Sequence, residues 1–186
     1  MVNVLIVYAT DWGNTKKMAE AVAAGAKSVP GTAVSVKPAE AAAADDLTAA
    51  DAVIVGTPVH MGSADWRVKK FIDTVCSGLW MKNAMAGKVG AVFATGSGFG
   101  NAGGGVELTL LGLLSNFAEL GMVIVPLPKN TPGYPKGGLQ WGPYGRSMGE
   151  NMEQTGLADE QTVAARHHGA NVARLAALLA GKKVFG

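Results

Sequence analysis

The sequence contains little cysteine, little charge and few aromatic residues. Cys76 is the only cysteine among 186 residues, which excludes an internal disulfide and a multi-cysteine metal or iron–sulfur site. Its apolar neighbours predict an unreactive thiol on a buried helix face. The scarcity of cysteine is typical of a reducing compartment, and we therefore expect a cytoplasmic protein.

Charge of either sign is also sparse. Charged residues make up 16% of the chain, and 16 basic against 14 acidic residues give a net charge of +2. This balance favours neither nucleic acid nor an anionic membrane as a partner. No apolar run is long enough to cross a bilayer, and no basic segment precedes the first apolar run. We therefore expect neither a membrane anchor nor an export signal.

Apolar residues are plentiful, at 48% of the chain, and they follow two alternating patterns. Continuous apolar runs of strand length alternate with segments of helical spacing, which predicts an α/β fold with a parallel sheet between two helical layers. The length fits a single domain over residues 1–186. The predicted strands lie at residues 2–8, 33–36, 52–55, 89–94 and 122–125.

A short polar turn joins the first predicted strand to the first predicted helix. The first amides of a helix lack carbonyl partners and carry partial positive charge, so such a turn attracts an anion. Thr10, Asn14 and Thr15 add side-chain donors, and Gly13 permits close backbone approach. The turn has neither the Gly-Lys-Ser/Thr ending of a Walker loop nor the dinucleotide glycine pattern. We predict a site for one terminal phosphate, held by neutral donors.

Two further loops follow the third and fourth predicted strands, at residues 56–63 and 95–105. Ligands of open parallel sheets lie beyond the carboxyl ends of the strands. Both loops are rich in glycine and poor in bulky side chains, so their main-chain groups can hold the edge of a flat heteroaromatic ring.

These segments together resemble the flavodoxin-like superfamily, and within it the WrbA-type NAD(P)H:quinone oxidoreductases. The resemblance is carried by the sequences YATDWGNT at residues 8–15, GTP at 56–58, GLW at 78–80, GGGVE at 103–107, GMVIVP at 121–126 and GPYG at 142–145. It implies a flavodoxin-like three-layer sandwich whose five-stranded parallel sheet has the order 2-1-3-4-5. It also implies non-covalent binding of FMN.

The resemblance further implies which residues bind the FMN. Residues 10–15 would hold the phosphate, residues 59–61 would border the isoalloxazine ring, and residues 95–105 would wrap its other edge. The implied cofactor-binding residues are Thr10, Asp11, Trp12, Gly13, Asn14, Thr15, Pro58, Val59, His60, Met61, Gly62, Thr95, Gly96, Ser97, Gly98, Phe99, Gly100, Asn101, Gly103 and Gly104.

By the same resemblance, NADH or NADPH would reduce the flavin, and a quinone or another small acceptor would reoxidise it by two-electron hydride transfer. His60 would act on the substrate or the flavin edge, and Trp80 would line the substrate side, often from a neighbouring subunit. No metal is required. A homo-oligomer, dimer or tetramer, is the implied assembly, because quinone reductases of this type are tetramers.

Two alternatives remain open for the function. The protein can be a flavodoxin-type electron carrier, although such carriers present a strongly acidic face that this composition does not suit. It can also be a non-catalytic protein whose flavin serves assembly or sensing. A phospho-receiver of the same fold is set aside, because Thr57 stands where the second acidic residue is needed.

Three other features lead to expectations that the structure tests. The adjacent His167 and His168 predict a partly exposed pair on a helix. Trp66, at a predicted helix start, is expected to pack against neighbouring residues. The irregular stretch at residues 127–158 is long for a compact domain, and we expect it to cover a neighbour or the flavin pocket.

Overall fold

The computed structural model describes residues 1–98 and 103–185. Its strands are β1 (Val2–Tyr8), β2 (Thr32–Pro38), β3 (Ala52–His60), β4 (Ser63–Ala64), β5 (Val89–Gly96), β6 (Val123–Ile124), β7 (Gly138–Leu139) and β8 (Gly142–Arg146). Its α-helices are α1 (Asn14–Lys27), α2 (Ala44–Ala49), α3 (Trp66–Phe71), α4 (Ser77–Trp80), α5 (Val106–Glu119), α6 (Tyr134–Gly137) and α7 (Asp159–Leu179). A 3₁₀ turn (Ala39–Ala41) precedes α2, and a π-helical segment (Ile72–Cys76) joins α3 to α4.

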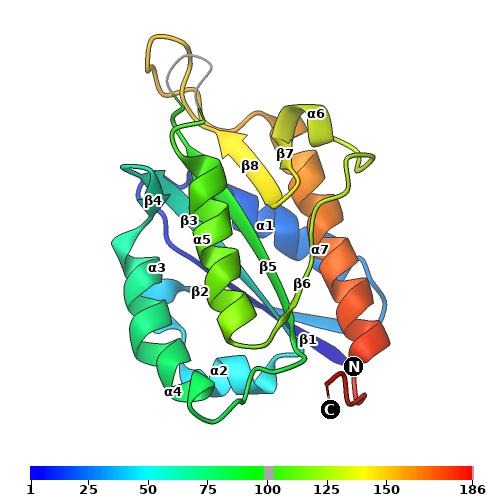
Figure 1. Ribbon diagram of the computed structural model, residues 1–186. Helices are drawn as coiled ribbons and strands as arrows, with labels where there is room; N and C mark the ends of the chain where they lie inside the picture. The colour runs from blue at the N-terminus through cyan, green and yellow to red at the C-terminus, as the bar shows by residue number, and fades with distance from the viewer. Residues whose placement is uncertain (99–102, 186) are drawn as a thin grey trace.

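A parallel sheet forms the centre of the fold, in the order β2-β1-β3-β5-β8, and the antiparallel strand β7 extends it. Helices α1 and α7 cover one face, whereas α3 and α5 cover the other (Figure 1). This arrangement confirms the predicted flavodoxin-like α/β sandwich. No described helix is both long and apolar enough to cross a membrane.

The fifth position of the sheet is shared by two strands, whereas a single strand at residues 122–125 was predicted. Strand β6 pairs only with Val89 and Gly90 at the start of β5, and β8 pairs with residues 94–96 at its end. The chain leaves β5 after Val125, since the next amide on that side, that of Leu127, donates to the carbonyl of Gln140. Strand β8 was missed because its sequence, GPYGR, contains residues that are rare in strands.

Two hydrophobic cores lie on opposite faces of the sheet, because successive strand residues point to opposite sides. In β1, Leu5 and Val7 face the core under α3 and α5, whereas Val4 and Ile6 face α1 and α7. Apolar residues at helical spacing in the covering helices supply the other half of each core. Cys76 is buried in the first, and burial raises the pKa of its thiol to about 12, as an unreactive thiol requires.

The expectation of a partly exposed histidine pair is wrong for one member. His167 is exposed, but His168 is fully buried in α7, where Gly169 packs closely against the backbone of Val22 in α1. Neither ring nitrogen of His168 has a hydrogen-bond partner among the described residues, and burial lowers its pKa to about 4. Trp66 is also not packed as expected, since 66% of it is exposed.

Candidate functional site

A cleft of about 130 Å³ lies at the carboxyl ends of the parallel strands. Four chain segments that are distant in sequence meet there, at the carboxyl ends of β3 and β5 and directly after β1 and β8. Its lining comprises Thr10, Asp11, Trp12, Asn14, Thr15, Pro58, Val59, His60, Thr95, Gly96, Ser97, Ser147 and Met148. The sheet topology thus brings together the three segments that the sequence singled out.

The turn before α1 has the geometry of an anion site. Gly13 has a φ of 84°, in the left-handed region that favours glycine, and its amide donates to Thr10 Oγ1 at 3.1 Å. The first backbone amide of this helix to reach a carbonyl is that of Lys17, which donates to Gly13 at 2.9 Å. The preceding amides of Asn14 and Thr15 have no carbonyl partner in the described chain, so they are available to a ligand.

Two hydroxyls, one from helix α1 and one from strand β5, meet behind this turn. Thr15 Oγ1 and Thr95 Oγ1 are 2.7 Å apart, and both residues are buried. Their hydrogen bond ties the start of α1 to the end of β5. Because one hydroxyl donates to the other, the accepting hydroxyl keeps its own hydrogen for a ligand.

The structure places the remaining predicted residues in three ways. Gly13 belongs to the turn without lining the cleft, and Met61 and Gly62 form the tight connection between β3 and β4. Gly98, Gly103 and Gly104 follow β5 but do not line the cleft in the described chain. Phe99, Gly100 and Asn101 lie outside the described residues.

Trp80 lies away from the cleft within one subunit. It ends α4, at the opposite end of the helical layer from β4 (Figure 1), and is half exposed. It borders a separate groove between the α3–α4 segment and α5, together with Cys76 and Leu120. A role for Trp80 at the cleft therefore requires a neighbouring subunit.

Sequence reasoning missed two residues that line the cleft, Ser147 and Met148. Both follow β8, and the backbone of Ser147 donates to the carbonyl of Gly96 at 2.9 Å. The long stretch at residues 127–158 therefore reaches the cleft, one of the two places that we expected it to cover. Their position could not be read from the sequence, because β8 itself was not recognised.

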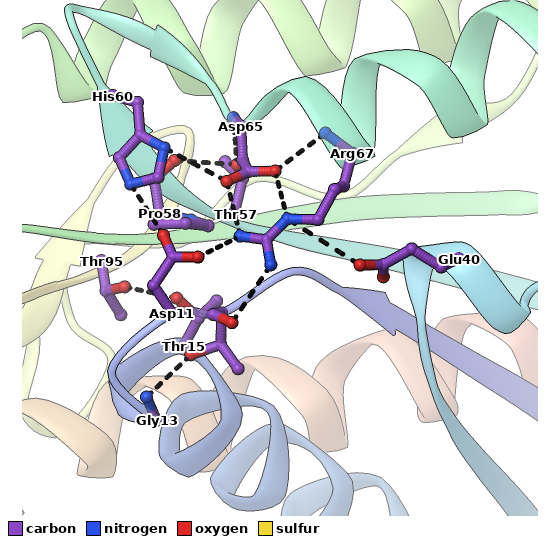
Figure 2. A network of polar contacts seen from close by, with 11 residues as sticks. Asp11, Gly13, Thr15, Glu40, Thr57, Pro58, His60, Asp65, Arg67 and Thr95 are labelled. Atoms are coloured by element: carbon purple, nitrogen blue, oxygen red, sulfur yellow. Dashed lines mark hydrogen bonds and ion pairs between the residues drawn. The ribbon is translucent and has the colours of Figure 1, made fainter.

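A network of ionic side chains borders the cleft, and it was also missed. Figure 2 shows Asp11 facing both His60 and Arg67, with Asp65 on the far side of those two residues. Asp65 caps the start of α3 and is 1% exposed, and its backbone amide donates to Thr57 Oγ1 at 2.9 Å. Aspartate immediately before an amphipathic segment is a common helix start, so this cap was visible in the sequence.

Arg67 joins the two carboxylates. Its Nε donates to Asp65 Oδ1 at 2.8 Å, and its Nη2 lies 2.7 Å from Asp65 Oδ2 and 2.6 Å from Asp11 Oδ1. Burial alone would raise the pKa of Asp65, but hydrogen bonds from the side chain and backbone of Arg67 outweigh it and lower that pKa below its usual value. The same side-chain bonds raise the pKa of Arg67. Both groups are therefore ionised at neutral pH.

His60 is held between the same two carboxylates. Its Nε2 lies 3.2 Å from Asp11 Oδ2, and its Nδ1 lies 3.1 Å from Asp65 Oδ2. A neutral imidazole has a single N–H group, so both contacts are hydrogen bonds only when the ring is protonated. Arg67 also lies 3.9 Å from Glu40 Oε1, so its guanidinium faces three carboxylates.

Ligand atoms of Asp11, His60 and Asp65 lie within 4.8 Å of one another, which is close enough for a shared metal ion. The guanidinium of Arg67 already donates to both carboxylates, however, so the cluster has its positive charge without a metal. We interpret it as an ion-pair network.

Comparison with known proteins agrees with this architecture. Residues 5–96 match the family model of a flavodoxin domain. An NAD(P)H dehydrogenase (quinone) from Paraburkholderia phymatum is 34% identical over 206 aligned positions, which cover 97% of this chain and 100% of that protein. A flavodoxin from Aquifex aeolicus is 40% identical over 120 residues, and this alignment spans only 64% of each protein.

Solved structures give the same result. The flavodoxin, WrbA-like protein from Agrobacterium tumefaciens is 27% identical with a TM-score of 0.73, and the match covers 96% of this chain and 99% of that one. The chain therefore belongs to the flavodoxin-like family of flavoproteins. Within that family, it is similar over nearly its whole length to the quinone dehydrogenase and to the WrbA-like structure.

Proposed function

We propose that the protein binds FMN in this cleft and acts as an NAD(P)H-dependent quinone oxidoreductase. The observation that carries the proposal is the meeting of free helix amides and threonine hydroxyls at the carboxyl ends of β1 and β5. This donor set fits a phosphate ester. The full-length similarity to an NAD(P)H dehydrogenase (quinone) supports the enzymatic part.

In this proposal the turn at residues 10–15 holds the phosphate. The amides of Asn14 and Thr15 and the hydroxyls of Thr10 and Thr15 are its donors. Pro58, Val59, Met61 and the backbone of residues 95–98 contact the flavin ring, with Gly103 and Gly104 on the same loop. The predicted contributions of Phe99, Gly100 and Asn101 belong to this ring-binding group.

Bound FMN would supply the chemistry of hydride transfer between NADH or NADPH and a quinone. The protein binds and orients the reactants. His60 lines the cleft between Asp11 and Asp65, where its imidazole would lie beside a bound acceptor. Trp12, 73% exposed at the rim, offers a flat apolar surface for a nicotinamide or quinone ring.

Trp80 completes the site in this proposal only from a second subunit, so we propose a homo-oligomer, either a dimer or a tetramer. The half-exposed indole borders a groove of about 190 Å³ at the surface. Sedimentation measurements on the purified protein test this point, because a monomer with full activity would remove Trp80 from the mechanism.

Steady-state kinetics test the enzymatic function. The purified FMN-loaded protein should oxidise NADH or NADPH when benzoquinone is present, with one quinone reduced per nicotinamide oxidised. A protein that binds FMN but does not oxidise either nucleotide would instead be an electron carrier. The 40% identity to a protein named flavodoxin favours that second candidate. Reduction by a separate flavodoxin reductase, without direct NAD(P)H oxidation, would establish it.

A further inference from the structure

Asp11 places a carboxylate inside the turn that we propose holds a phosphate. Like charges close together oppose binding, and an anion site normally excludes carboxylates. The turn nevertheless needs only one further feature to accept an anion, which is a means of cancelling the charge of Asp11. The structure contains that feature in the guanidinium of Arg67.

The contacts of Asp11 satisfy both of its oxygens. Oδ1 accepts from Arg67 Nη2 at 2.6 Å, and Oδ2 lies 3.2 Å from His60 Nε2. Arg67 Nη1 also donates to the carbonyl of Thr10 at 3.4 Å. The guanidinium therefore fixes both the side chain of Asp11 and the backbone at the start of the turn. In Figure 2 the Asp11 carboxylate points toward Arg67 and His60, on the side away from Gly13.

Arg67 cannot leave this position to bind a phosphate itself. Two of its nitrogens are bonded to Asp65, which is 1% exposed, and its own side chain is only 16% exposed. Glu40 Oε1 lies 3.9 Å from Arg67 Nε and adds a weaker attraction on the other side. Releasing the guanidinium would leave the buried carboxylate of Asp65 unpaired, which is strongly unfavourable.

We propose that Arg67 is a positioning residue that neutralises Asp11 and thereby sets the preference of the cleft for FMN over riboflavin. Asp65 anchors the guanidinium, and the guanidinium turns the Asp11 carboxylate away from the phosphate position. This role rests on the proposed function, because it assumes that the turn holds the phosphate of FMN. Riboflavin has the same ring but no phosphate, so it does not experience the charge of Asp11.

The dissociation constants of FMN and riboflavin, measured by quenching of flavin fluorescence, test this role in four proteins. These are the unchanged protein, Arg67→Gln, Asp11→Asn and the double variant. Arg67→Gln should weaken FMN binding about tenfold, the order expected for one uncompensated charge, and leave riboflavin binding unchanged. Asp11→Asn should not weaken FMN binding, because it removes a carboxylate from the turn and leaves Arg67 in place.

The double variant gives the decisive comparison. Restored FMN affinity in Arg67→Gln with Asp11→Asn supports the role, since the uncompensated charge is gone. Equal weakening of FMN and riboflavin by Arg67→Gln, or no recovery in the double variant, overturns it. If Arg67→Gln does not fold, the same comparison is made in Asp65→Asn with Arg67→Gln, which removes both members of the buried pair.

Failure of the FMN site and failure of the role of Arg67 give different results. If the unchanged protein binds neither flavin, the proposed FMN site itself is wrong. If it prefers FMN and that preference is the same in Arg67→Gln, only the role of Arg67 is wrong.

Discussion

Asp65 Oδ2 lies 3.1 Å from His60 Nδ1, although Asp65 is buried and His60 is half exposed at the edge of the cleft. The buried carboxylate of Asp65 thus orients the more exposed imidazole of His60. It also caps α3 and binds Arg67, so one buried group orients the β3–β4 connection, the start of a helix and the guanidinium. Asp65 thus links three elements on this side of the cleft.

Replacing Asp65 with asparagine should destabilise the fold. The change leaves Arg67 without its buried counter-ion, and breaking a buried pair of this kind costs about 3 kcal/mol. The free energy of unfolding in urea measures the effect. Asp73→Asn is the matched control, since Asp73 pairs with Lys69 on the surface and its loss should cost no more than about 0.5 kcal/mol. Equal costs for the two variants would show that the Asp65 network adds no stability.

The buried His168 should make stability depend on pH. In the folded protein its pKa is about 4, compared with 6.5 ordinarily. As the pH falls through 6.5 toward 4, the unfolded chain takes up a proton that the folded chain does not, so stability falls. The pKa difference corresponds to about 3 kcal/mol over this range. The unfolding free energy measured at several pH values should lose this slope in His168→Leu.

Two controls sharpen the histidine prediction. His167→Gln should keep the pH dependence, because His167 is exposed on the same helix. His168→Leu should also be as stable as the unchanged protein or more stable at pH 7.5, since neither ring nitrogen has a partner to lose among the described residues. A pH slope that survives in His168→Leu would assign it to other groups.

Gly105 holds the loop after β5 against the β3–β4 connection. Its φ is +87°, and a Cβ there would lie 2.5 Å from the Cα of Gly62. Gly105→Ala should therefore destabilise the protein by at least about 2 kcal/mol and weaken FMN binding. Gly31→Ala separates backbone strain from crowding, because Gly31 has a φ of +77° but no atom within 4 Å of its Cβ position. It should cost about 1 kcal/mol and leave FMN binding unchanged.

Replacing Thr10 and Thr15 together with valine should weaken FMN binding at least about tenfold, because each hydroxyl is a proposed phosphate donor and a lost charged hydrogen bond costs about 1.5 to 3 kcal/mol. Fluorescence titration measures the change, and circular dichroism checks the fold. Thr32→Val provides the control, because the buried Thr32 Oγ1 has no partner among the described residues and lies in β2. Unchanged FMN affinity in the double variant would place the phosphate elsewhere.

Sequence patterns predicted the fold well where periodicity was strong. The first four predicted strands correspond to β1, β2, β3 and β5, because apolar runs reflect burial on both faces of the sheet. Strand β8 escaped notice because its pairing with β5 holds a sequence of poor strand propensity in place. Tertiary contacts override local preference at such positions.

The cleft also combines features that local sequence predicts with features that only tertiary contacts create. Its turn was recognisable because helix-start chemistry is local, and the topology then brought the other two segments to it. The network of Asp11, His60, Asp65 and Arg67 was not recognisable. Arg67 and Asp11 are 56 positions apart, and no local pattern links them. The sequence showed a turn without a cation, whereas the fold brings a guanidinium to its first residues.

The central claim is that the turn before α1 holds the phosphate of FMN, and titration of the purified protein with FMN tests it most directly. We expect a yellow protein that binds one FMN per chain with a dissociation constant between about 1 nM and about 1 µM, and binds riboflavin more weakly. A colourless protein that takes up no added FMN, or one that binds riboflavin as tightly as FMN, would contradict the claim.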